Sequence, residues 1–118
     1  NVTGPMFHSL HLLFEQQYTE LATAVDTIAE RIRALGDKAP GSYAAFARLS
    51  SVKDAEGEPD ATEMLKTLTA DHRIVAERAN KVLKLAAGHE DEGTAAIASE
   101  RIEIHEKAAW MLSAHLGD

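Results

Sequence analysis

The chain has 118 residues, of which 45% are hydrophobic and 26% are charged, so it is long enough for one small domain and too short for two ordinary ones. It has no cysteine, which excludes disulfides and thiolate metal sites, and its net charge of −7 repels nucleic acid at long range. No apolar stretch approaches the roughly 20 residues of a membrane span, and the first residues do not resemble a secretion signal. We therefore expect a cytoplasmic protein with no membrane partner.

The first predicted element is a long helix over about residues 5–35. Pro5 suits the first turn of a helix, and Gly36 marks its end. Between them, apolar residues recur with a helical period for about eight turns. This stripe consists of Phe7, Leu10, Phe14, Tyr18, Leu21, Val25, Ile28, Ile32 and Leu35.

Three further helices are predicted in the rest of the chain. The apolar cluster in APGSYAAFARLSS indicates a brief helix over 42–49, within a long connection. Asp60 and Glu63 form a capping box that opens a helix over about 60–87, with an apolar stripe of Met64, Leu68, Val75, Ala79, Val82 and Ala86. The last helix, over about 92–116, follows the acidic run Glu90, Asp91 and Glu92 and has an apolar face of Ile97, Ile104, Ala108, Met111 and Leu112.

These elements predict an all-α fold, because no strand pattern or nucleotide-binding glycine motif is present. Three long helices and one short helix are typical of a helical bundle that forms a single domain over residues 1–118. Long helices in a bundle usually cover each other in fours. We therefore expect either a first helix before Asn1 or a second chain that supplies the missing surface.

Four ionisable residues lie beside the apolar stripe of the first helix: His11, Glu15, Asp26 and Glu30. At 100° per residue their directions relative to His11 are about 0°, 40°, 60° and 100°, so all four project into one sector. Along the axis, however, His11 and Asp26 are roughly 22 Å apart, since each residue rises about 1.5 Å. One chain cannot close a single metal site with all four residues.

The four positions are symmetric about a point between Glu20 and Leu21. If two copies of the helix pack antiparallel about a two-fold axis at that point, His11 meets Glu30 of the second copy and Glu15 meets its Asp26. Two identical clusters of nitrogen and oxygen ligands result. An imidazole with several carboxylates suits iron better than it suits a structural zinc ion.

Two simpler interpretations remain open for these residues. Each could be a solvated side chain beside an apolar stripe, and Glu30 could form an ordinary ion pair with Arg31 or Arg33. A di-iron site within one subunit is not expected, because bundles of that kind use Glu-x-x-His and none of the six histidines has Glu three residues before it.

The stretch NVTGPMFHSLHLLFEQQYTELATAVDTIAERIRALG resembles the signature of the Dps-like mini-ferritins, in which N-V-x-G-x-x-F leads to x-x-L-H-x-x-F-[D/E] and then to V-D-x-I-A-E-R-x-x-x-L-G. The similarity extends to HEKAAWML near the end of the chain. The resemblance implies a ferritin-like four-helix bundle, of which the first helix is missing from this chain. It also implies iron ligands at His11, Glu15, Asp26 and Glu30, the last two from a neighbouring subunit.

The activity implied by the resemblance is that of a ferroxidase. A hollow homo-dodecamer, built from two-fold dimers, would oxidise Fe(II), preferably with hydrogen peroxide, and store Fe(III) inside. The acidic run at 90–92 could line a channel that concentrates Fe(II), or it could simply stabilise the positive end of a helix dipole. Two rival functions are a DNA-compacting stress protein, which the charge does not support, and a non-catalytic helical interaction module.

Several residues depart from the family pattern or have no role in it. A further histidine and a tryptophan precede the position of Asn1 in the family, and Glu15 replaces the Asp of many relatives. His8 is not a family ligand, and we interpret it as a solvent-facing residue or an aid to iron entry. The remaining histidines have no identifiable partners and are interpreted as surface or interface residues: His72, His89, His105 and His115.

Overall fold

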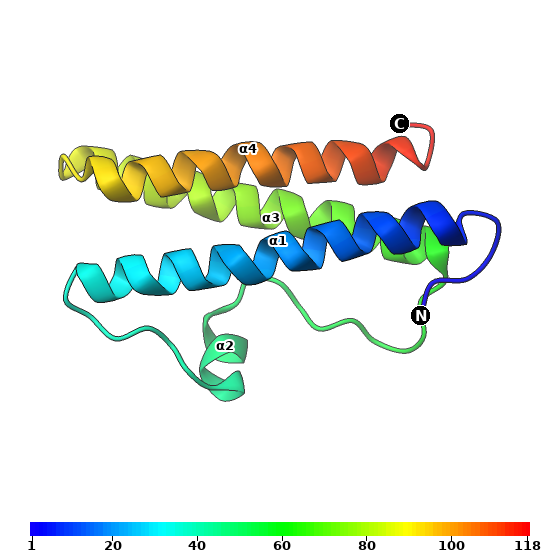
Figure 1. Cartoon of the computed structure of the whole chain (residues 1–118), viewed down its shortest axis with the longest axis horizontal. Coiled ribbons are helices and arrows are strands. Elements are labelled where there is room, and N and C mark those ends of the chain that lie inside the picture. The colour runs from blue at the N-terminus through cyan, green and yellow to red at the C-terminus, as the bar shows by residue number, and fades with distance from the viewer. The chain divides into compact units, whose positions relative to one another are not determined.

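The structure is all-α, as the sequence predicts. The computed structural model describes residues 1–118. Its four helices, in chain order, are α1 (Phe7–Ala34), α2 (Tyr43–Leu49), α3 (Ala61–Gly88) and α4 (Glu92–Ala114) (Figure 1). Each bound lies within two residues of the one expected from the sequence. None of these helices combines the length and the apolar character that a membrane span needs.

The chain divides into two compact units. Residues 5–51 form one unit, which contains α1 and α2, and residues 1–4 with 52–118 form the other, which contains α3 and α4. The single domain that the sequence predicts over residues 1–118 stays a prediction.

Helix α1 exposes most of the apolar stripe that predicts it. It ends just before Gly36, whose φ of +98° lies in the left-handed region that favours glycine. Leu10 is buried, as expected for the stripe, and so is Leu13, which lies outside it. The periodicity therefore predicts the helix correctly but not its burial, because six stripe residues are exposed: Phe7, Tyr18, Leu21, Val25, Ile28 and Leu35.

Helix α2 is a short element within the connection that follows α1. The Ser42 hydroxyl accepts a hydrogen bond from the backbone N–H of Ala45 at 3.2 Å, which satisfies one free donor of the first turn. Tyr43 and Phe46 pack edge to face with ring centroids 6.4 Å apart. Both rings and Leu49 remain exposed.

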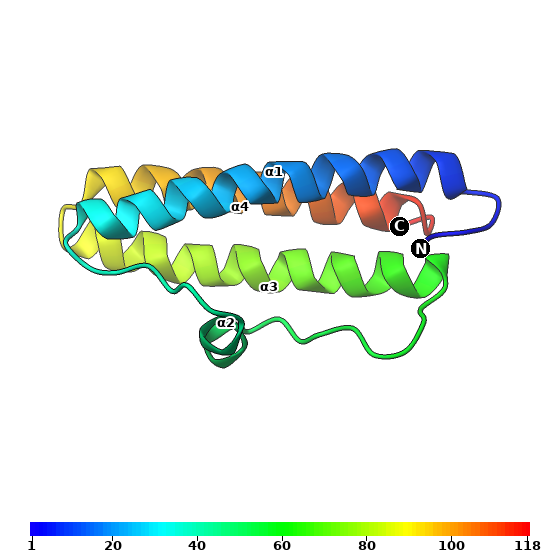
Figure 2. The same ribbon diagram turned by 60° about the horizontal axis from the view of Figure 1, so that its bottom comes forward.

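Helices α3 and α4 form an antiparallel hairpin joined by residues 89–91 (Figure 2). The predicted capping box is present at the start of α3, where Asp60 Oδ1 accepts from Glu63 N at 2.8 Å and Glu63 Oε2 accepts from Asp60 N at 2.9 Å. The Asp91 side chain caps α4 by accepting from Thr94 N at 3.0 Å. Each helix of the hairpin therefore begins with an acidic side chain that satisfies backbone donors.

The buried face of this hairpin follows the predicted apolar stripes only in part. Ala86, Ala108 and Leu112 are buried as predicted, but most of the other buried residues lie one position after a predicted one. Met64, Leu68 and Val75 are only half-buried, whereas Val82 and Met111 are 46% and 36% exposed, which corrects their predicted place on the buried face. On α3 the buried residues are Leu65, Thr69, His72, Ala76 and Ala86, and on α4 they are Ala98, Arg101, His105, Ala108, Ala109, Leu112 and Ser113. The displacement escapes a hydrophobicity pattern because polar residues occupy the centre of both faces.

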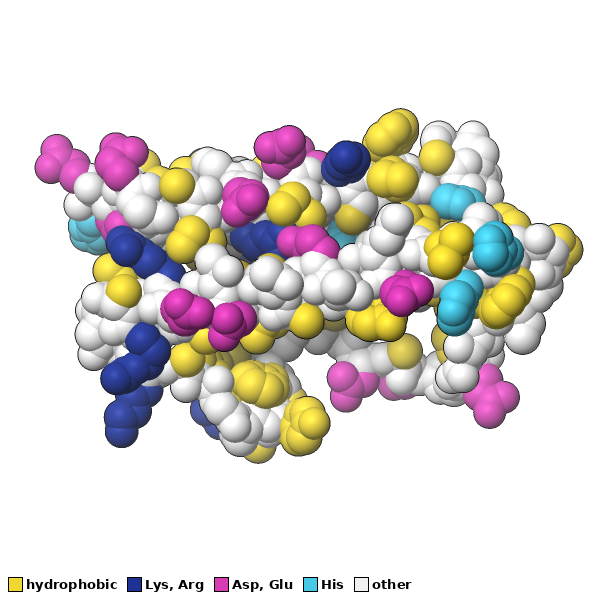
Figure 3. All heavy atoms as spheres, viewed as in Figure 1, with side chains coloured by type: hydrophobic (Ala, Val, Ile, Leu, Met, Phe, Trp, Pro, Cys, Tyr) yellow, Lys and Arg dark blue, Asp and Glu magenta, His cyan; other side chains and the backbone are white.

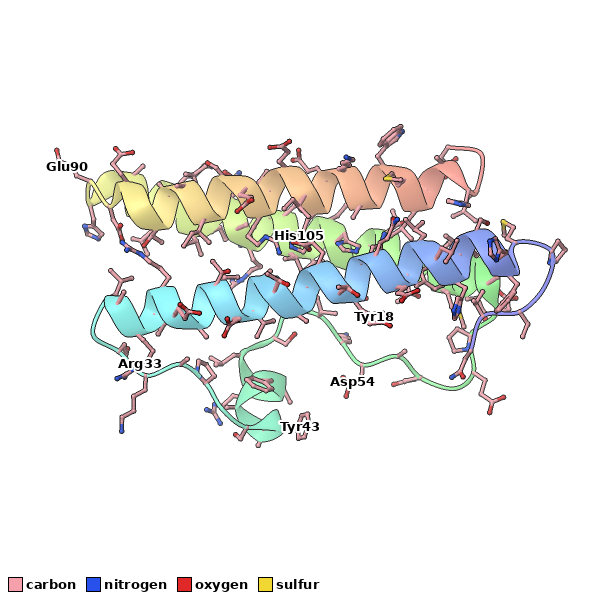
Figure 4. The ribbon with its side chains drawn as sticks, viewed as in Figure 1. Tyr18, Arg33, Tyr43, Asp54, Glu90 and His105 are labelled. Carbon is pink, nitrogen blue, oxygen red and sulfur yellow. The ribbon has the colours of Figure 1, made fainter.

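A pair of buried histidines lies on this face. His72 and His105 are 7% and 2% exposed, and a hydrogen bond joins their Nδ1 atoms at 2.9 Å. Their ring centroids are 5.1 Å apart, and Figure 4 shows His105 directed from α4 towards α3. The interpretation of these two histidines as surface or interface residues without partners is therefore wrong.

The histidine pair should contribute to stability as a unit. Replacing either residue, as in His72→Leu or His105→Leu, leaves the other ring buried without this partner and should lower the free energy of unfolding by about 1–3 kcal/mol. The double variant should cost about 1 kcal/mol less than the sum of the single variants. Urea denaturation of the four proteins at neutral pH measures this coupling, and strictly additive losses would contradict it.

Candidate metal site

Helix α1 carries all four predicted ligands on its surface. His11, Glu15, Asp26 and Glu30 are each exposed, and all four lie in a single uninterrupted helix. Because the helix is continuous, the sector of about 100° worked out from the sequence applies to the structure as well. Figure 3 shows acidic side chains along α1 and histidines near its N-terminal end on the viewed face.

Within one chain, these residues do not converge on a metal. No three histidine or acidic side chains come close enough to hold one ion. His11 and Glu15 lie near the start of the helix, and Asp26 and Glu30 lie near its end. A site that used all four residues would need ligands from a second chain.

The donor set itself fits iron. It offers one imidazole nitrogen and three carboxylates, which suit an ion that cycles between Fe(II) and Fe(III). Exposure leaves the side chains free to adjust when a second surface approaches. Arg33, one of the alternative ion-pair partners of Glu30, donates from its guanidinium to the Asp37 carbonyl at 3.0 Å.

The ring of His11 is supported on one side by Phe7. The two ring centroids are 5.3 Å apart, with an angle of 34° between the planes. Phe7 precedes His11 by four residues, so it lies one turn away at about −40° on the helix, opposite to the side on which Glu15 lies. The aromatic contact therefore restricts His11 without occupying the sector that contains the carboxylates.

Exposed apolar side chains border this ligand sector. Tyr18 and Val25 are 64% and 66% exposed, and their directions relative to His11 are about −20° and −40°. Figure 4 shows Tyr18 projecting from the middle of α1. Tyr18 and Val25 thus form an exposed apolar edge beside the ligand sector, and burial of this edge against a second surface would be favourable.

The acidic residues Glu90, Asp91 and Glu92 lie at the start of α4, and only Asp91 has a clear structural role there. Asp91 is the helix cap, since its carboxylate accepts from both the backbone N–H and the hydroxyl of Thr94. Glu90 has a φ of +57° and projects outward at the turn between α3 and α4 (Figure 4). The capping interpretation is thus confirmed for Asp91, and Glu90 and Glu92 are exposed.

The other three histidines outside the core have simpler environments. His8 is exposed on α1. His89 is exposed at the C-terminal end of α3, and His115 Nδ1 donates to the Met111 carbonyl at 2.8 Å. None of these three histidines belongs to a group of three or more side chains that could hold one metal ion.

Comparison with known proteins gives matches over the whole chain. The family model described as a ferritin-like domain matches residues 1–118. A low temperature-induced protein of Nostoc is 39% identical over 114 residues, which are 95% of this chain and 64% of that protein. The chain thus spans less than two thirds of the length of this relative.

Two further matches carry descriptive names. DNA protection during starvation protein 2 of Bacillus anthracis is 36% identical over 115 residues, covering 98% of this chain and 79% of the relative. The crystal structure of the Dps protein of Vibrio cholerae, described as a member of the ferritin-like diiron-carboxylate superfamily, superposes with a TM-score of 0.92 at 33% identity. That match covers 98% of this chain and 73% of the other.

The exposed apolar edge of α1 should drive association. We expect the wild-type protein to sediment as a large assembly at micromolar concentration, since otherwise this surface stays in water. A Tyr18→Glu/Val25→Glu variant places charges on the surface and should sediment as a smaller species with unchanged helical circular dichroism. A wild-type monomer, or a variant of undiminished size, would refute the role of this edge.

Proposed function

Because the chain belongs to the Dps family of the ferritin-like superfamily, we propose that it oxidises Fe(II) and stores the ferric product inside a hollow homo-dodecamer. The observation that carries the proposal is the single sector of α1 on which His11, Glu15, Asp26 and Glu30 are exposed. Their positions match the ligand positions in the family motif that the sequence resembles.

The proposed site forms between two subunits related by a two-fold axis. His11 and Glu15 come from one chain, and Asp26 and Glu30 come from the other, because antiparallel packing about the midpoint of α1 brings these pairs together. Each dimer then contains two identical sites. This arrangement is supported by the large axial separation of the two pairs within one helix and by the exposed apolar edge of Tyr18 and Val25.

The imidazole and the carboxylates of the proposed site have different roles in iron oxidation. The neutral imidazole of His11 supplies a nitrogen donor that binds the incoming Fe(II), whereas the carboxylates bind Fe(III) more strongly than Fe(II) and so favour oxidation. Two Fe(II) ions give one electron each to one molecule of hydrogen peroxide. The O–O bond breaks, two protons are taken up, and two Fe(III) and two water molecules result. Paired electron delivery avoids release of hydroxyl radical.

The two rival functions predict different behaviour. A DNA-compacting protein would retard DNA in a gel until moderate salt reverses the binding, and the net charge of −7 gives no support to this role. A helical interaction module would assemble normally and respond to iron in the same way with or without the four proposed ligands.

Mixed assemblies give a sharp test of the shared site. A His11→Ala/Glu15→Ala variant and an Asp26→Ala/Glu30→Ala variant should each lose peroxide-driven iron oxidation by about tenfold or more, since even residues that only orient ligands matter at that level. If both variants are dissociated and reassembled together in equal amounts, half of the dimers are mixed and each holds one intact site. About a quarter of the wild-type rate should return.

The control for this test is each variant taken through dissociation and reassembly alone, which should recover no activity. Mass spectrometry of intact dimers confirms that subunits have mixed. Absence of recovery in confirmed mixed dimers would rule out ligands shared in this way, because a site within one chain is defective in every subunit.

The acidic residues beside Asp91 allow a test of iron entry. A Glu90→Gln/Glu92→Gln variant keeps the Asp91 cap and should slow iron uptake a few-fold at low salt, with the difference shrinking as salt screens the attraction. Initial rates of iron uptake measure the effect. The matched control is Glu56→Gln/Glu58→Gln, which changes the net charge equally at two exposed residues in the loop before α3. Equal rates for both variants would favour a purely structural role for the run.

A further inference from the structure

A second histidine lies within the ligand sector of α1. His8 precedes His11 by three residues, so its direction is about 60° from that of His11, in the middle of the sector that the four proposed ligands define. Both side chains are exposed, and both lie within the first turns of the helix. Residues three apart on a helix have Cβ atoms about 5–6 Å apart, which is close enough for two imidazoles to share one ion.

The contact between Phe7 and His11 does not block the side of the His11 ring that faces His8. Phe7 supports the His11 ring from the side at about −40°, whereas His8 lies on the opposite side, one turn towards the N-terminus. Glu15 lies on the same side as His8, one turn towards the C-terminus. His11 is therefore flanked by an imidazole before it and a carboxylate after it.

The geometry points to a capture site, and we propose that His8 and His11 together bind a divalent transition-metal ion before it reaches the carboxylates. Imidazole nitrogen binds Fe(II), Co(II) and Zn(II) well, whereas Fe(III) prefers carboxylate oxygen. A pair of imidazoles thus favours the ion before oxidation. The inference rests on the proposed function in naming Fe(II) as the natural ion and in using the two-fold packing of α1, and it adds His8 as a binding residue outside the family's ligand set.

The proposed two-fold packing also places a positively charged residue of the second chain near His8. His8 and Arg33 are equally far from the midpoint between Glu20 and Leu21, so antiparallel packing places Arg33 of one chain near His8 of the other. The Arg33 guanidinium, which also donates to the Asp37 carbonyl, adds a positive charge at the outer end of the site. This charge lowers the affinity for a cation beside His8, so the captured ion binds less tightly there than beside Glu15 and the partner's carboxylates.

Cobalt binding tests the inference without iron chemistry. The assembled, metal-free protein is titrated with Co(II), with binding followed by calorimetry and by the visible absorption of the ion. His8→Gln should weaken binding by about tenfold and shift the absorption spectrum, because a nitrogen ligand is lost. The matched control, His89→Gln, removes an exposed histidine that has no second histidine within a helical turn and should bind Co(II) as the wild type does.

Iron kinetics then separate capture from oxidation. His8→Gln should require several-fold more Fe(II) for half-maximal rate while the rate at saturating Fe(II) stays the same, because the carboxylates are intact. Unchanged Co(II) affinity and spectrum in His8→Gln would overturn the inference. If the wild-type protein oxidises no iron but His8→Gln still loses Co(II) affinity, the proposed function fails while the metal-binding pair stands.

Discussion

The geometry of one uninterrupted helix is the constraint on which the candidate site depends. Helix α1 runs for 28 residues without a break, so the direction of each side chain is set by its position in the sequence. The helix keeps His11 and Glu30 within one sector of about 100° and separates them along its length. The same regularity therefore aligns the ligands and prevents one chain from closing a site with them.

The sequence predicts the helices well because their signals are local. The capping box of Asp60 and Glu63, the turn at Gly36 and the apolar period each act within a few residues. Burial depends on which surfaces meet, and here the prediction is weaker. A hydrophobicity pattern cannot place His72 and His105 at the centre of a core, because it treats each imidazole as a polar residue and cannot see that the two satisfy each other.

For the candidate site, the sequence predicts the directions in which the ligands project from α1, but not the distances between ligands of two subunits. Helical periodicity places His11, Glu15, Asp26 and Glu30 in one sector of α1, and the structure shows that all four are exposed there. The contact of Phe7 with His11 could also have been suspected from their spacing of four residues. The distances between ligands across a subunit interface belong to a second chain, so neither the periodicity nor a single chain determines them.

The hydrogen bond between the two buried histidines requires the ring on α3 and the ring on α4 to be in different tautomers. While both rings are neutral, a hydrogen bond between two Nδ1 atoms requires opposite tautomers: one ring carries its proton on Nδ1, and the other carries it on Nε2. At the far edge of the pair, one Nε2 must then be an acceptor and the other a donor. One ring therefore needs a hydrogen-bond donor near its Nε2, and the other needs an acceptor. A substitution near one ring that changes its tautomer would also force the opposite tautomer on the other ring.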